Sequence, residues 1–390
     1  MSKAARPAAS APPRVGIVVN NVGGYSRAVI RGAASFGFAR NWTCRAQGVN
    51  ARDMLSDLTQ FDGLIVQAGL TELRGLLANC PVPVVNVSSA PTAYPAPSVV
   101  SDDVQVGRLG ADHLLARGHR RLIFYRPDNR QFVELRQSGF TRRAGESGVR
   151  VERAATLAEL DDCLAGPRPV AILGCNDRAA LAALDRVEAL GLACPDEVAV
   201  LGVDNDDLVQ GLARPPMSTI NTARERIGYE AAALLGRIID GEAVADDFVT
   251  LVAPHGVIAR QSTDSAAVPD PAAADAARFL RANAARRIGI DDVADHVAMS
   301  RRQIERRFRA AFGRSLHDEL HRCRIERSRR LLVETDLTIG QVADASGFSS
   351  ASYFTTSFRR STGESPGQFR DSRLFGIVGT DPSEERPRST

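Results

Sequence analysis

The sequence predicts a two-lobe α/β domain followed by an all-α domain that contains two helix-turn-helix units. Three observations support this fold class. Short apolar runs alternate with helical stretches over residues 14–260, which is typical of parallel sheets with helices on both faces. Two helix-turn-helix patterns follow, at 290–308 and 339–358. Finally, a chain of 390 residues is too long for a single hydrophobic core.

The α/β part begins after residues 1–13, which are rich in Pro, Ala and Ser and for which we expect disorder. Its length favours two lobes, with a ligand cleft at the carboxyl ends of the strands. The apolar runs predict strands at 14–20, 63–67, 82–87, 98–101, 121–126, 170–173 and 197–203. The helical stretches are clearest at 25–40, 104–117, 177–190 and 223–240.

The two helix-turn-helix patterns share their spacing. Each first helix holds a Val-Ala pair, 293–294 or 342–343, whose small Ala lets a second helix cross close by. The turn then has Ala298 or Gly347, and Gly tolerates the positive φ that a tight turn can demand. The final Phe lies ten residues after Ala298 but eleven after Gly347. We therefore expect the second turn to be one residue longer.

The second helix of each unit is predicted to begin at a serine N-cap, Ser300 or Ser349. A helix over 316–334 is expected to bridge the units, with one face formed by Leu320, Ile325, Ser328 and Leu332. The apolar anchors of the two second helices are Ile304, Phe308, Phe354 and Phe358. A lone pattern of this kind is a weak signal, but two in register are a strong one.

Charge separates the two parts of the chain. Residues 272–373 hold 19 Arg, no Lys and 13 acidic residues, a formal charge of +6, whereas residues 1–271 carry −2. A basic module on a near-neutral body suits nucleic-acid binding, although solvated Arg-rich helix faces would give the same count. The segment 261–271 has the Ser, Ala, Asp and Pro content of a linker, and the tail 374–390 is expected to be disordered.

Other signals exclude several classes of protein. Six Cys without a Cys-x-x-Cys pair, and no signal-peptide or membrane-length apolar run, predict a cytoplasmic protein without a membrane segment. His317 and His321 have a metal-ligand spacing, but Asp318 replaces the Glu of a zinc protease and no third ligand is evident. Residues 145–148 lack the nucleophile-elbow pattern. We therefore predict no metal, no cofactor and no enzyme activity.

Two family resemblances are carried by specific segments. Residues 100–125, 175–180 and 198–205, followed by Pro215, Ser218 and Thr219, resemble the effector domain of the LacI family. That domain is similar to periplasmic sugar-binding proteins, and the resemblance covers most of 14–260. Residues 275–372 resemble the AraC/XylS family domain, most specifically at 343–366. A LacI-type protein has its DNA-binding unit ahead of the effector domain, whereas here that unit follows it, within 272–373.

The LacI resemblance implies a polar ligand in the cleft between the lobes. Asp204 ends a strand there, and its carboxylate can accept two sugar hydroxyl protons; the alternative is a cap for the following turn. Asn205 is its neighbour. Arg136 matches a ligand-contacting arginine of the family, with a surface arginine as the alternative. Asp103 matches a cleft-side acid but could simply start its helix.

Three more residues are candidate ligand contacts. Asn176 and Asp177 open a helix directly after a strand, and Asp177 could equally be an N-cap. Tyr25 follows Gly23-Gly24 after the first strand, where an aromatic ring could form a stacking wall for a sugar or pack in the core.

On the DNA side, Arg301, Arg302 and Arg306 face roughly one side of the first recognition helix. The family position favours Arg302 and Arg306 for guanine edges, although phosphate contact is the commoner role of any one arginine. The second unit presents shorter side chains, so we expect the first to provide most of the direct readout. The remaining DNA-binding candidates are Ser350, Ser352, Thr356 and two phosphate-binding arginines, Arg359 and Arg360.

These features together predict a sugar-responsive regulator that binds double-stranded operator DNA as a homodimer. The resemblance implies activation of sugar-utilisation genes, with D-xylose or a related sugar as effector and RNA polymerase as a partner. A repressor responding to another sugar is the near alternative. A sugar-binding protein with a nonfunctional tail, and an enzyme of the two-lobe type, are the alternatives from other classes.

Overall fold

The computed structural model describes residues 11–20, 24–48, 57–69, 73–90, 94–265, 267–268 and 270–374. Most of the segments expected to be disordered, 1–13 and 374–390, lies outside these residues, as does Gly23. Leu374 is described and is the last residue of the helix Pro366–Leu374. The chain divides into two compact units, and the described parts are 11–100 with 224–252 and 101–223 with 253–374. Two six-stranded sheets followed by a helical domain confirm the predicted fold class.

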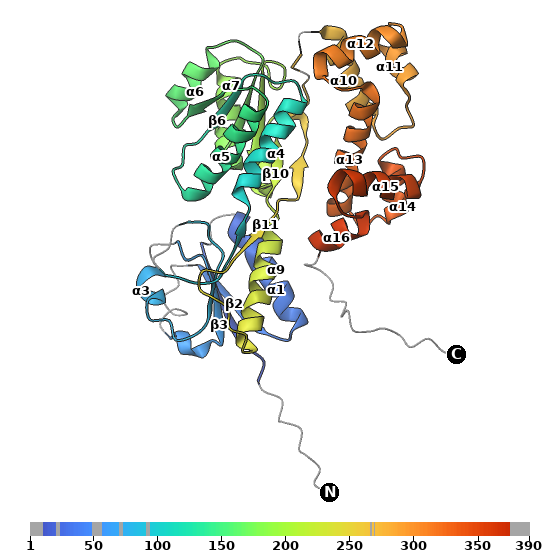
Figure 1. Cartoon of the computed structure of the whole chain (residues 1–390). Coiled ribbons are helices and arrows are strands. Elements are labelled where there is room, and N and C mark those ends of the chain that lie inside the picture. The colour runs from blue at the N-terminus through green and yellow to red at the C-terminus, as the bar shows by residue number, and fades with distance from the viewer. Residues whose placement is uncertain are drawn as a thin grey trace, which may run out of the picture. The chain divides into compact units, whose positions relative to one another are not determined.

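The first unit is built on a sheet with the order β11-β5-β4-β3-β1-β2. The strand pairs β1-β2, β1-β3, β3-β4 and β4-β5 are parallel. Helices α1 (Gly24–Ala39) and α9 (Arg224–Ile239) pack against each other so closely that a Cβ on Gly32 would lie 1.8 Å from the Glu225 carbonyl oxygen (Figure 1). The other elements are β1 (Arg14–Val19), β2 (Thr43–Gly48), η1 (Leu58–Gln60), β3 (Gly63–Val66), α3 (Arg74–Leu77), β4 (Val84–Asn86), β5 (Ser98–Ser101) and β11 (Val249–Val252).

The second unit begins with a sheet of order β12-β10-β9-β8-β6-β7, in which β12 alone among the paired strands runs antiparallel, against β10. Its central strands are completely buried, as continuous apolar runs predict. The elements are α4 (Asp103–Ala116), β6 (Leu122–Tyr125), α5 (Gln131–Glu146), β7 (Val151–Ala154), α6 (Leu157–Leu164), β8 (Val170–Gly174), α7 (Asp177–Ala189), β9 (Val198–Val203), α8 (Asp207–Leu212), β10 (Ser218–Asn221) and β12 (Gly256–Ile258).

The helical domain of the second unit has two cores joined by α13 (Leu316–Glu334) (Figure 1). The first half of α13 packs into the core of α10–α12, and its second half packs into the core of α14–α16. The expected face of α13 is confirmed, since Leu320, Ile325, Ser328 and Leu332 are all buried. The other helices are α10 (Pro271–Asn283), α11 (Ile290–His296), α12 (Arg301–Phe312), α14 (Ile339–Ala345), α15 (Ala351–Thr362) and α16 (Pro366–Leu374).

The two helix-turn-helix turns differ by one residue, as predicted. Four residues separate α11 from α12, and five separate α14 from α15. Both turn residues have a positive φ, 53° at Ala298 and 81° at Gly347. The longer turn moves the second N-cap by one position, so the prediction of Ser349 is wrong. Ser350 is the cap, and its hydroxyl accepts a hydrogen bond from the Tyr353 amide at 3.2 Å.

The predicted linker 261–271 begins inside the second unit's core. Gln261–Thr263 form a 3-10 turn, η3, and the side chains of Ser262 and Thr263 are fully buried. Ser262 donates a hydrogen bond to the Val200 carbonyl at 2.6 Å. Asp270 at the far end of the segment caps α10 by accepting from two backbone amides at 3.0 Å. This segment is therefore held at both ends.

Candidate functional site

A charged cluster lies at the carboxyl ends of the second sheet's strands. Arg136 on α5 donates to Asp103 at 2.8 Å, to the Cys175 carbonyl at 2.7 Å and to Asp204 at 3.5 Å. Arg136 is 6% exposed, so the alternative of a surface arginine is wrong. The two carboxylates hold the pKa of Arg136 above its usual value against the opposing effect of burial, which is the largest single contribution.

Close helix packing sets the geometry of this cluster. A Cβ on Gly107 of α4 would lie 2.0 Å from the Arg136 carbonyl, and one on Gly139 of α5 would lie 2.0 Å from the Val104 carbonyl. Only glycine at both positions allows the two helices to approach so closely. The approach brings Asp103, the first residue of α4, against Arg136. Sequence reasoning missed this role, because only the folded chain shows that these two glycines lie at the same helix contact.

Asp204 and Asn205 occupy a strained turn directly after β9. Their φ angles are 114° and 50°. The angle at Asp204 is one that non-glycine residues rarely adopt, whereas Asn tolerates the left-handed value at Asn205. Asp204 does not cap the following helix, because Asp206 does so through its contact with the Leu208 amide. The Asp204 side chain is 23% exposed and accepts from Thr222 at 3.4 Å. A partly solvated carboxylate beside a buried arginine can bind a polar ligand.

Asn176 and Asp177 are bonded within the protein. Asn176, not Asp177, is the N-cap of α7, and its side chain accepts from the Ala179 amide at 2.8 Å. Asp177 is 1% exposed and accepts from the Thr219 hydroxyl at 2.6 Å and the Asp206 amide at 2.7 Å. Burial, with a smaller contribution from Asp204, raises the pKa of Asp177 to about 7. These contacts fix the turn that carries Asp204.

Arg260 belongs to the same turn, although sequence reasoning gave it no site role. Its guanidinium donates to the Asn205 side chain at 3.0 Å, to Gln210 at 3.1 Å and to the Met217 carbonyl at 2.9 Å. Arg260 thus positions the Asn205 side chain. The backbone amide of Asn205 donates a hydrogen bond to the Thr219 hydroxyl at 3.1 Å.

Tyr25 lies in the first unit, near the start of α1. It is partly buried, and its hydroxyl donates a hydrogen bond to the carbonyl of Val87, just after β4. This bond ties the phenol to the carboxyl end of a neighbouring strand and leaves the ring as the part of Tyr25 suited to stacking.

The helices α12 and α15 present the predicted DNA-facing residues. Arg301 is exposed but is held by Glu305 at 3.0 Å and Asp291 at 3.4 Å. Arg302 and Arg306 are also exposed, and the side chain of neither has a hydrogen bond or ion pair with another described residue. Two adjacent, uncompensated guanidinium groups on one helix face are available for phosphate or for guanine edges.

The corresponding face of α15 is short and polar. Ser352 and Thr356 are exposed, and the Thr356 hydroxyl donates to the Ser352 carbonyl at 3.2 Å. Arg359 and Arg360 are exposed in the last turn. Tyr353 was not predicted, yet the residue is 47% exposed and is the largest exposed apolar residue on the helix.

Among the described residues, no group of three or more His, Cys, Asp or Glu is placed to hold a metal ion. Within the same residues, no helix combines the length and apolar character needed to cross a membrane.

Family models match both parts of the chain. A periplasmic binding protein-like domain matches residues 111–263, and a helix-turn-helix domain matches residues 293–372. With the two-sheet fold and the paired helices α12 and α15, these matches define a DNA-binding transcription regulator that carries a periplasmic-binding-like effector domain.

Relatives of known function match nearly the whole chain. The xylose operon regulatory protein of Escherichia coli is 28% identical over 385 residues, covering 92% of this chain and 97% of that protein. Its Haemophilus influenzae counterpart is 28% identical, with coverage of 82% and 87%. The solved structure of the xylose-binding transcription activator xylR is 26% identical with a TM-score of 0.59, covering 93% of this chain and 98% of that one. The chain is thus similar over most of its length to proteins named as xylose operon regulators.

Proposed function

We propose that the chain is a transcription activator of xylose-utilisation genes that responds to D-xylose or a related sugar. The observation that carries the proposal is the Asp103–Arg136–Asp204 cluster, which lies on the same chain as two helix-turn-helix units. The relatives named as xylose operon regulators, and the solved relative described as xylose-binding, support the choice of sugar.

The cluster has the chemistry that a sugar needs. Asp204 accepts hydroxyl protons in charge-assisted bonds, and Arg136 donates to a ring or hydroxyl oxygen. Asp103 and Asp177 position these two groups through the contacts described above, together with Asn176 and Asn205. Tyr25, in the first unit, is a further candidate sugar contact through its aromatic ring. We assign residues 14–260 to the sugar-binding part and residues 272–373 to the DNA-binding part.

DNA recognition is assigned to the two second helices. Arg302 and Arg306 read base edges from α12, since both are exposed and uncompensated, while Arg301 shares its charge with Glu305 and Asp291. Tandem units can place two such helices in successive major-groove segments, about 34 Å apart. On α15, Ser350, Ser352 and Thr356 make the weaker contacts, to base edges directly or through water. Arg359 and Arg360 are assigned to phosphates.

The regulator acts in the cytoplasm as a homodimer on double-stranded operator DNA and recruits RNA polymerase. Sugar binding shifts the population between two DNA-binding geometries, and the free energy of that shift cannot exceed the difference in sugar-binding free energy between them. Nothing in this scheme requires a cofactor, a metal or a catalytic group.

The direct test is operator affinity measured with and without saturating D-xylose. We expect tighter operator binding with xylose, and equal affinities would contradict the switch. The variant Asp204→Ala should lose the xylose response and keep basal DNA binding. Asp207→Ala is its matched control, because that exposed carboxylate lies on α8 after the turn. A reporter assay in a deletion strain then determines the sign of regulation, and lower expression of the xylose genes is the result expected for an activator.

A further inference from the structure

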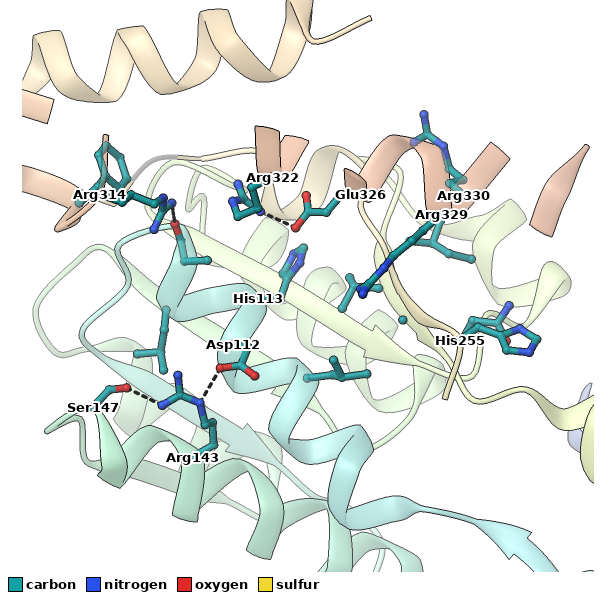
Figure 2. A pocket seen from close by; sticks show the side chains of 18 of the residues that line it. Asp112, His113, Arg143, Ser147, His255, Arg314, Arg322, Glu326, Arg329 and Arg330 are labelled. Carbon is teal, nitrogen blue, oxygen red and sulfur yellow. Dashed lines mark hydrogen bonds and ion pairs between the residues drawn. The ribbon is translucent and has the colours of Figure 1, made fainter. Parts of the chain in front are cut away.

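A cavity of about 480 Å³ lies within the second unit, between the sheet domain and the helical domain. One wall is formed by α4, the end of α5 and β12, and the other by the end of α12 and by α13 (Figure 2). Figure 2 shows Arg314, Arg322 and Glu326 on one side, facing His113, Asp112 and Arg143 on the other. The volume falls in the range typical of small-molecule sites.

The lining of this cavity is strongly basic. Six arginines but only two carboxylates, Asp112 and Glu326, line it. Two carboxylates that do not line the cavity form ion pairs with lining arginines, Glu319 with Arg314 and Glu146 with Arg143. Six arginines against these four carboxylates still leave an excess of two positive charges. The six arginines are Arg120, Arg143, Arg314, Arg322, Arg329 and Arg330.

Two basic side chains at the cavity are largely removed from water. Arg329 has a buried Nε atom without a hydrogen-bond partner among the described residues. Burial lowers the pKa of its guanidinium, against the opposing effect of Glu326 and Glu364. His113 is buried between Thr263 and Arg117, at 2.8 Å and 3.0 Å. Burial, followed by the charges of Arg117 and Arg322, holds the pKa of His113 well below its usual value. A buried donor without a partner is costly unless a ligand satisfies it.

We propose that this cavity binds a small organic phosphate. A phosphoryl group offers three acceptor oxygens that suit forked guanidinium donors approaching from several directions. Arg143 and Arg120 provide donors from the sheet-domain side, and Arg329 and Arg330 provide them from α13. Leu109, Leu115, Val257, Phe312 and Val333 add apolar walls for the carbon body of a phosphate ester.

The position of the cavity gives the ligand a regulatory role. Both walls already touch: Arg117 at the end of α4 lies 3.9 Å from Glu326 on α13, and Arg314 donates to the Ala116 carbonyl. An anion bonded to both walls stabilises this arrangement of effector and DNA-binding domains over any other. Organic phosphate is therefore a second effector, acting away from Asp204. The regulatory part rests on the proposed function, whereas the binding itself does not.

Titration calorimetry on the full-length protein tests the binding, with inorganic phosphate and pyrophosphate as probes in chloride buffer. We expect one site per chain, with pyrophosphate bound more tightly because it carries more charge. The double variant Arg329→Gln/Arg330→Gln should weaken pyrophosphate binding at least tenfold. Leu109→Glu should do the same while keeping every arginine. The matched control Arg178→Gln removes an exposed charge on α7, away from the cavity, and should bind as the unmodified protein does.

Three outcomes would overturn the site: no saturable heat with either probe, cavity variants that bind normally, or binding lost in Arg302→Gln/Arg306→Gln but retained in the cavity variants. The last outcome would place the anion on the DNA-facing helix. The regulatory role is tested by operator affinity at fixed ionic strength, since any added salt weakens DNA binding. Pyrophosphate should change that affinity in the unmodified protein and not in the cavity double variant. Equal effects in both would remove the regulatory role, independently of the response to xylose.

Discussion

Replacing Arg136 by Met tests the structural account of the charged cluster. The substitution keeps most of the side-chain volume but removes hydrogen bonds of 2.8 Å to Asp103 and 2.7 Å to the Cys175 carbonyl. The Asp103 side chain is 1% exposed, so its charge loses a buried partner that water cannot replace. Breaking such a pair costs about 3–5 kcal/mol. Asp204 adds little to this cost, because its side chain is 23% exposed and stays partly solvated.

The double variant Asp103→Asn/Arg136→Met should recover much of that loss, because it leaves no buried unpaired charge. Hydrogen exchange resolved to peptides measures the opening free energy of β8 and α4 separately from that of the helical domain. A loss of about 3 kcal/mol corresponds to roughly 100-fold faster exchange in those peptides. Unchanged exchange in Arg136→Met, or a double variant no more stable than the single one, would refute the reasoning.

Three further predictions concern other parts of the chain. Arg306→Ala should weaken operator binding by about 1–3 kcal/mol and relax the sequence preference at one base pair. Arg301→Ala should have a smaller effect, because Arg301 is ion-paired with Glu305. A uniform loss of affinity across DNA sequences would identify Arg306 as a phosphate contact instead. Burial lowers the pKa of His119 to about 3. Below about pH 6.5 the unfolded chain therefore binds a proton that the folded chain does not bind, and the free energy of unfolding falls by about 1.4 kcal/mol per pH unit down to about pH 3. His119→Gln should flatten acid unfolding curves by that slope, and an unchanged slope would contradict the assignment. Gly347→Ala should destabilise the second helix-turn-helix unit by about 1–2 kcal/mol or more, because φ is 81° and a Cβ would lie 2.2 Å from the Ala284 carbonyl oxygen. The control Gly340→Ala in α14 has room for a Cβ and should be neutral or stabilising. Thermal unfolding measures both variants.

The sequence alone determined the fold class because its signals are local. Continuous apolar runs identified the buried strands β1, β3, β8 and β9, and the helical spacing of apolar residues identified α13 with its buried face. Five of the described strands were missed: the inner strand β10 and the edge strands β2, β7, β11 and β12. The sequences of β2 and β7, Thr-Cys-Arg-Ala-Gln-Gly and Val-Glu-Arg-Ala, contain no apolar run, since an edge strand pairs on one side only and need not be apolar throughout.

The tertiary structure decided which polar residues meet. Asp103, Arg136, Cys175 and Asp204 are far apart in the sequence. They come together where β8 and β9 end, where α4 begins and where the first two turns of α5 lie. A one-residue difference in turn length moved the N-cap of α15 from Ser349 to Ser350, and only backbone geometry shows which hydroxyl reaches the amide. The basic cavity between α4 and α13 has no sequence signature at all. It arises from the packing of two domains, and packing depends on contacts between residues that no local pattern connects.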